Sequence, residues 1–172
     1  MLFVLGIMGV VAAMAGFQMN TARPSMKGDG AMRIVMSQMR MARELAITQR
    51  RYMRLSFTDP NKVEILREEV PGPSTTVVGT AVIEGGVEYG LVTGLPDSPD
   101  AFGGGAAIDF GIVTNVKFTP DGTLVNQDGA TANGSVFLAM PDVARSARAI
   151  TVLGSTGRIR GYRWDGRSWK MV

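Results

Sequence analysis

The chain of 172 residues contains no cysteine and no histidine. The lack of cysteine excludes disulfides and thiolate nucleophiles, and the lack of histidine removes the imidazole general base. Together the two absences also exclude the usual zinc sites. Catalysis would depend on carboxylates, serine or lysine alone, and no serine lies in a nucleophile-elbow pattern. We therefore expect no enzyme activity, no metal and no cofactor.

Charge is absent from the first 22 residues, and Arg23 is the first ionisable side chain. As a helix, the apolar run Met1–Phe17 spans about 25 Å, less than the roughly 30 Å of a bilayer core. We interpret it as a transmembrane helix that lacks its own beginning and expect the true start upstream. A secretory signal peptide is the alternative. A signal peptide should open with basic residues, and none precedes the apolar run here. The small residues Ala12, Ala13, Ala15 and Gly16 could nevertheless mimic a cleavage site.

Charge is unevenly distributed along the rest of the chain. Residues 23–54 contain eight Lys or Arg against two acidic residues, residues 55–142 contain three against twelve, and residues 143–172 contain seven against one. The formal net charge of +3 therefore conceals two basic blocks on either side of an acidic one. Such segregation favours complementary surfaces between neighbouring subunits, or a basic surface for a polyanion. Ordinary solvated faces are the alternative.

A helix with one apolar side is predicted for residues 25–49. Apolar side chains recur there at helical spacing, whereas Arg33, Arg40 and Arg43 fall mostly off the apolar stripe. We expect the stripe to pack on a sheet through the side chains of Ile34, Val35, Met39, Ala42, Leu45 and Ala46.

Beyond residue 50 the apolar period changes to two, which predicts strands. They are expected at residues 53–57, 63–65, 75–83, 87–92, 113–118, 123–125, 136–140, 149–153, 158–162 and 168–171. Residues 95–105 contain two prolines and three consecutive glycines, which favours a loop. The predicted fold class is α+β: a long N-terminal helix, half transmembrane and half amphipathic, packed on an antiparallel β-sheet domain. The predicted division is a transmembrane half over residues 1–24 and an extracytoplasmic domain over residues 25–172.

Four segments resemble one family. Leu2–Met14 is similar to the interior of the N-terminal helix of type IV pilins and type II secretion pseudopilins. Met41–Arg50 resembles the end of that helix in the GspH/FimT family of minor pseudopilins and minor pilins. Phe118–Thr123 resembles the family's F-x-P-x-G turn, and Ile150–Ile159 resembles its terminal strand pair ending in Gly-Arg. The segments occur in family order and together cover about residues 1–160.

The resemblance implies a structural function. It suggests a GspH-like minor pseudopilin near the tip of a type II secretion pseudopilus, in a hetero-oligomeric filament with other pilin or pseudopilin subunits. It also implies a single-pass bacterial inner-membrane protein with its C-terminal domain in the periplasm. Aligning Gly9 with the family's helix glycine puts the family's leader and glutamate before Met1, so processing by prepilin peptidase would need a restored start. The side chains expected to pack in the membrane or filament are Leu2, Phe3, Val4, Leu5, Ile7, Gly9, Val10 and Val11.

The end of the chain supports an alternative function. Cations alternate there with the rings of Tyr162, Trp164 and Trp169, a composition that suits a phosphate backbone and stacked bases. The Gly-Arg-x-Arg sequence resembles the tail of FimT-like minor pilins, in which it is associated with DNA binding during uptake. The other interpretation is an ordinary strand with solvated cations and packed rings. The candidate DNA-binding residues are Arg158, Arg160, Arg163, Arg167 and Lys170.

Overall fold

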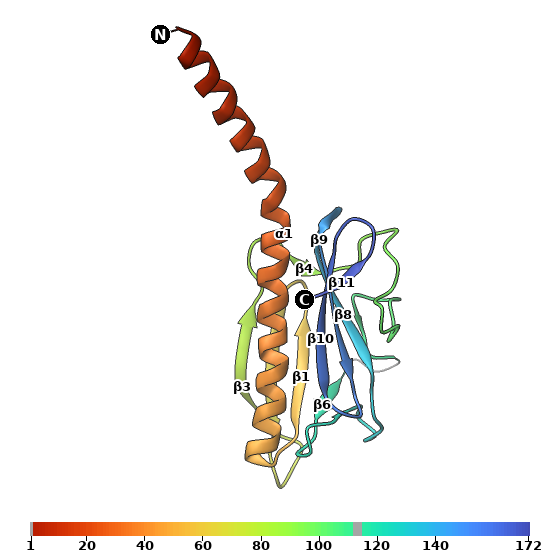
Figure 1. Cartoon of the computed structure of the whole chain (residues 1–172). Coiled ribbons are helices and arrows are strands. Elements are labelled where there is room, and N and C mark those ends of the chain that lie inside the picture. The colour runs from red at the N-terminus through yellow and green to blue at the C-terminus, as the bar shows by residue number, and fades with distance from the viewer. Residues whose placement is uncertain (1, 112–114) are drawn as a thin grey trace.

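The computed structural model describes the backbone of residues 2–111 and 115–172, and the side chains from residue 23 onward within those ranges. One helix, α1 (Leu2–Gln49), is present in this part of the chain and contains Pro24. Figure 1 shows α1 running along the β domain and its N-terminal part continuing beyond it.

The described strands form two antiparallel sheets. The first sheet has the order β3 (Thr75–Val82), β2 (Lys62–Glu68), β1 (Met53–Thr58), β6 (Val116–Phe118) and β7 (Leu124–Val125). The second has the order β11 (Trp169–Met171), β10 (Arg158–Trp164), β9 (Val143–Leu153), β8 (Gly134–Met140) and β4 (Glu88–Tyr89), with β5 (Ile108–Asp109) also paired to β8. Helix α1 contacts strands of both sheets, as Figure 1 also shows.

The predicted fold class, a long helix packed on an antiparallel β-sheet domain, is wrong. The strands divide into two sheets, and strands rather than helix make up most of the regular structure beyond residue 22. Alternation within a strand shows that one of its faces is buried, but not which strand lies beside it. The division into two sheets therefore left no local signal in the sequence.

The predicted localisation, a single-pass inner-membrane protein, is also wrong. A helix must be both long and strongly apolar to cross a bilayer. No helix within the described ranges meets both requirements. The division of the chain at residue 24 stays a prediction, because the side chains before residue 23 are not among those described.

The apolar stripe of α1 lies in the core between the two sheets. Val35, Met39, Ala42 and Ala46 are fully buried there, and Leu45 is partly buried and packs against the same core. Ile34 is half-buried. The stripe meets side chains from both sheets, among them Leu55, Ile65, Phe118, Val136, Leu138, Ile150 and Val152.

Two glycines let α1 approach the second sheet closely. A Cβ added to Gly28 on the helix would overlap the carbonyl oxygen of Ser146 in β9. A Cβ added to Gly161 in β10 would lie 2.8 Å from the Met36 sulfur and 2.9 Å from the Met32 sulfur. A larger side chain at Gly28 would force the helix and sheet apart because it meets backbone, whereas one at Gly161 would require the Met32 and Met36 side chains to move.

A buried arginine connects β9 to the helix where α1 leaves the domain. The Arg148 side chain is fully buried, and its Nε donates a 2.8 Å hydrogen bond to the Asp29 carboxylate. Its Nη2 donates to the carbonyl oxygen and the hydroxyl of Ser25 at 2.6 and 2.9 Å, and its Nη1 donates to the carbonyl oxygens of Ala147 and Arg145. Burial lowers the pKa of Arg148, and Asp29 opposes that shift.

Replacing this arginine should destabilise the fold. Arg148→Met leaves Asp29 and the carbonyl groups of Ser25, Arg145 and Ala147 without this donor, and we expect the free energy of unfolding to fall by about 3–5 kcal/mol. Urea unfolding followed by circular dichroism measures the change. The matched control is Arg145→Met, because Arg145 is exposed on the same strand. Equal stability of the two variants would contradict the assigned role of Arg148.

Candidate interaction site

Three segments far apart in the sequence meet at Arg43 on α1. The Arg43 Nε donates a 3.0 Å hydrogen bond to the carbonyl oxygen of Gly122, in the turn between β6 and β7. The Arg43 Nη2 donates a 3.2 Å hydrogen bond to the carbonyl oxygen of Thr156, in the turn between β9 and β10. These are the three body segments on which the family resemblance was based, so their residues share one location in the structure.

Glycine is required at both turns. Gly122 and Gly157 have φ of 78° and 62°, in the left-handed region that side chains disfavour. A Cβ on Gly157 would overlap the Gly122 carbonyl oxygen and lie 2.7 Å from the Arg43 Nε. The two turns and the guanidinium can be this close only because neither turn carries a side chain there.

An open groove of about 500 Å³ lies beside this junction, at the C-terminal end of α1. Its lining comes from the last turns of the helix and from the start of β10. The lining residues are Arg40, Arg43, Glu44, Ile47, Thr48, Gly157, Arg158 and Ile159.

The groove has an excess of positive charge. Three arginines and one glutamate line it. None of Arg40, Arg43 and Arg158 takes part in an ion pair with another described residue. Arg43 donates only to backbone carbonyl oxygens. No carboxylate of the described residues therefore pairs with its charge. The groove therefore suits an anionic group, and its apolar wall at Ile47 and Ile159 suits a protein surface.

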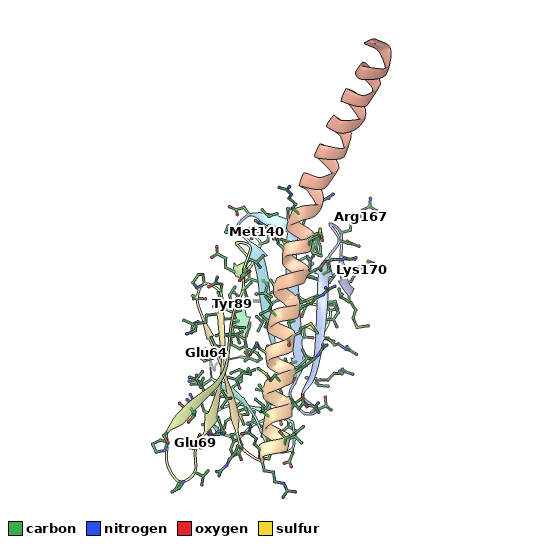
Figure 2. The ribbon with its side chains drawn as sticks, turned by 90° about the vertical axis from the view of Figure 1, so that its left-hand side faces the viewer. Glu64, Glu69, Tyr89, Met140, Arg167 and Lys170 are labelled. Atoms are coloured by element: carbon green, nitrogen blue, oxygen red, sulfur yellow. The ribbon has the colours of Figure 1, made fainter. Side chains whose placement is uncertain are left out.

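The five candidate DNA-binding residues are not gathered on one surface. Along β10, Arg158 and Arg160 project from one face of the sheet and Arg163 projects from the other. Lys170 pairs with Arg163 in the β10–β11 register and shares its face. Arg167 lies in the turn between these strands, and Figure 2 shows Arg167 and Lys170 toward the end of the domain from which the N-terminal part of α1 extends.

Most of these cations also have acidic neighbours. Arg160 pairs with Asp100 at 2.9 Å, Arg163 lies 3.8 Å from Asp29, and Lys170 lies 3.9 Å from Asp165. Only Arg158 and Arg167 among the five have no ion pair with another described residue.

The aromatic side chains of the tail pack against the protein. Trp169 contacts Trp164 edge-on with ring centroids 5.4 Å apart, and its Nε1 donates a 2.9 Å hydrogen bond to the Pro96 carbonyl oxygen. Tyr162 is 5% exposed and packs with Phe137. The rings thus stabilise the outer face of the second sheet and the loop above it, and Tyr162 in particular is not available for base stacking.

Asp100 attaches the loop over residues 91–107 to this outer face. Its carboxylate accepts hydrogen bonds from Thr151 Oγ1 at 2.6 Å, Tyr162 Oη at 2.8 Å and Arg160 Nη1 at 2.9 Å. Burial would raise the pKa of Asp100, but the hydrogen bonds from Thr151 and Tyr162 and the charge of Arg160 outweigh it, so the pKa lies below its ordinary value.

Sequence analysis missed both Asp100 and Arg148. Asp100 lies in a segment rich in proline and glycine that shows no periodicity. Arg148 is a lone charge within residues 146–153, a run that is otherwise uncharged, and this was the only signal that could have identified it. The partners of Asp100, and the partners of Arg148 on α1, lie 51 to 123 positions away in the chain.

The N-terminal packing residues lie outside the described side chains. The structure gives the helical backbone from residue 2 but no side-chain surroundings before residue 23. The expected packing therefore stays a prediction for Leu2, Phe3, Val4, Leu5, Ile7, Gly9, Val10 and Val11.

The Asp100 network should make stability depend on pH in the acid range. Because the pKa of Asp100 is lowered in the folded state, its contribution is complete above the ordinary aspartate value of about 4 and is lost as pH falls through the lowered pKa. We expect Asp100→Asn to cost about 1–3 kcal/mol at pH 7 and progressively less below pH ~4. Urea unfolding from pH 7 to pH 2.5 measures this, with the exposed Asp142→Asn as control. A cost that does not change with pH would contradict the assignment.

Comparison with known proteins identified no relative of this chain. No family model, no curated protein and no solved structure matches the chain. The site must therefore be judged on its own geometry: an arginine-lined groove at the junction of α1 with two glycine turns.

Proposed function

We propose that this chain is a structural subunit of a protein filament, a minor pseudopilin of the GspH kind in a type II secretion pseudopilus, with no catalytic role. The observation that carries the proposal is the division of α1. Its C-terminal part lies in the core of the β domain, whereas its N-terminal part continues beyond the domain (Figure 1) and has an uncharged sequence. An extended helix of this kind can pack with helices of other subunits while the domain remains outside the bundle.

The arginine groove provides a second contact with a neighbouring subunit. Its unpaired arginines suit an acidic surface, and residues 55–142 carry twelve acidic side chains against three basic ones. Asp59 and Glu84 are exposed examples without an ion pair among the described residues. A basic site on one subunit that binds an acidic site on the next is a heterologous contact, and such contacts produce open filaments when the rotation between subunits does not close a ring.

DNA binding in the manner of FimT-like minor pilins is the second candidate. It is favoured by Arg158, which lines the groove with Arg40 and Arg43 and so gives three arginines at one place. The packed rings of Tyr162 and Trp169 and the division of the tail cations between two faces favour it less. We therefore rank it below the protein–protein function.

Charge reversal in the groove tests the filament proposal. The purified full chain is mixed with purified pseudopilins of a type II secretion system, and complexes are measured by sedimentation velocity. We expect a hetero-oligomer that Arg40→Glu with Arg158→Glu weakens by at least about tenfold, because two attractive charges become repulsive. The matched control is Arg33→Glu with Arg167→Glu, two exposed arginines away from the groove, which should bind as the wild type does.

A parallel titration with duplex DNA distinguishes the two candidates. No complex with any pseudopilin would contradict the filament proposal. Salt-dependent DNA binding whose log–log slope decreases by roughly one unit for each groove arginine removed would establish the alternative instead.

A further inference from the structure

Strand β3 is a long sheet edge with one irregularity, a bulge at Val78 where its register with β2 shifts between Val77 and Gly79. It has eight residues and terminates the first sheet, whereas the other edge strands of the two described sheets, β7, β11, β4 and β5, have two or three residues each. Figure 1 shows β3 at the left margin of the domain, with no other element beyond it. A terminal strand presents a row of N–H and C=O groups that a further strand can pair with, and short edges limit that pairing. Of these edge strands, only β3 is long enough for an extended ladder.

The composition of β3 also leaves its edge open to pairing with another strand. Its sequence, Thr-Thr-Val-Val-Gly-Thr-Ala-Val, contains no charge and no proline, the residues that normally block edge pairing. Val77 and Val82 on the strand are 53% and 52% exposed, and Val70 in the preceding turn is 68% exposed. Burying these exposed valines against a partner strand would be favourable, because it removes apolar surface from water. The backbone of β3 is already in strand conformation.

One face of β3 is already covered. A Cβ on Gly79 would lie 2.9 Å from the Met41 methyl group and 3.3 Å from the Gln38 Oε1, both on α1. The helix therefore occupies the space above this face. A partner must add along the strand edge, in the plane of the sheet.

We propose that a second copy of this chain pairs with β3 through its own β3, antiparallel and about a two-fold axis. With the two strands fully overlapped and the bulged Val78 of each copy left unpaired, Thr75 lies opposite Val82 and Val77 lies opposite Thr80. Such cross-strand pairs of β-branched residues stabilise a sheet, and no like charges meet because the strand has none. The contact joins two five-stranded sheets into one and uses the free edge of both copies, so it closes at a dimer.

The strand itself favours a copy of the chain over a foreign segment. An uncharged edge offers no charge complementarity with which to select a different partner, whereas it is compatible with itself in the two-fold register. The ladder is about 27 Å long, and the interface is small for a protein dimer, so we expect a weak complex. The inference does not depend on the proposed filament function, because neither α1 nor the arginine groove takes part in it.

The absence of cysteine permits a direct test on the full chain, because every thiol is then an introduced one. A tagged Val77→Cys variant is mixed with an untagged Thr80→Cys variant under mild oxidation, and mixed disulfides are measured over time on non-reducing gels. Opposed residues of a ladder have Cβ atoms about 4.5–5.5 Å apart, near the distance that a disulfide requires. We expect this pair to form the mixed disulfide faster than Val77→Cys with Met171→Cys, which places the second thiol on the exposed part of β11.

A charge on the edge separates ladder pairing from association elsewhere in the chain. Adding Val82→Lys to both cysteine variants should slow the mixed disulfide roughly tenfold, because two lysines are then placed at the edge. Leu91→Lys, at an exposed leucine outside β3, should leave the rate unchanged, and circular dichroism checks the fold of each variant. Formation no faster than in the β11 pair, or unaffected by Val82→Lys, would overturn the proposal.

Discussion

The buried side of α1 is the constraint on which both sheets depend. Strands β7, β4 and β5 have two residues each, and β6 and β11 have three, so the ladders alone provide little stability. The helix supplies a continuous apolar surface, with Val35, Met39 and Ala42 fully buried and in contact with a core drawn from both sheets. Without this surface each sheet would expose its inner face, because packed layers must share one core.

Polar contacts hold the helix at both ends of the domain. Arg148 bonds to Ser25 and Asp29 where α1 leaves the domain, and Arg43 bonds to two turns near the helix C-terminus. Both arginines donate to backbone carbonyl oxygens, which fixes the helix along its axis as well as across it. A helix fixed in this way can transmit the position of its N-terminal part to the domain.

The sequence predicted what depends on local pattern. The apolar stripe of α1 and the alternation of Met53 and Leu55 with Arg54 and Ser56 follow from the periods of helix and strand, and the buried positions in both elements follow the same periods. The two-sheet arrangement depends on which strands pair, as β1 does with β6 although the paired residues are 61 to 65 positions apart, and alternation carries no such information. The groove and the Asp100 network were missed for the same reason, since each joins residues from distant segments.

Native-state hydrogen exchange tests most directly whether α1 unites the two sheets. If both sheets depend on the buried side of the helix, the amides of helix residues 31–46, of β1 and β2, and of β8 and β9 should exchange with one common free energy, that of global unfolding. Leu45→Asp, beside the core, should lower that free energy equally in all three groups. Exchange from one sheet at a lower free energy, while the helix and the other sheet stay protected, would contradict the account.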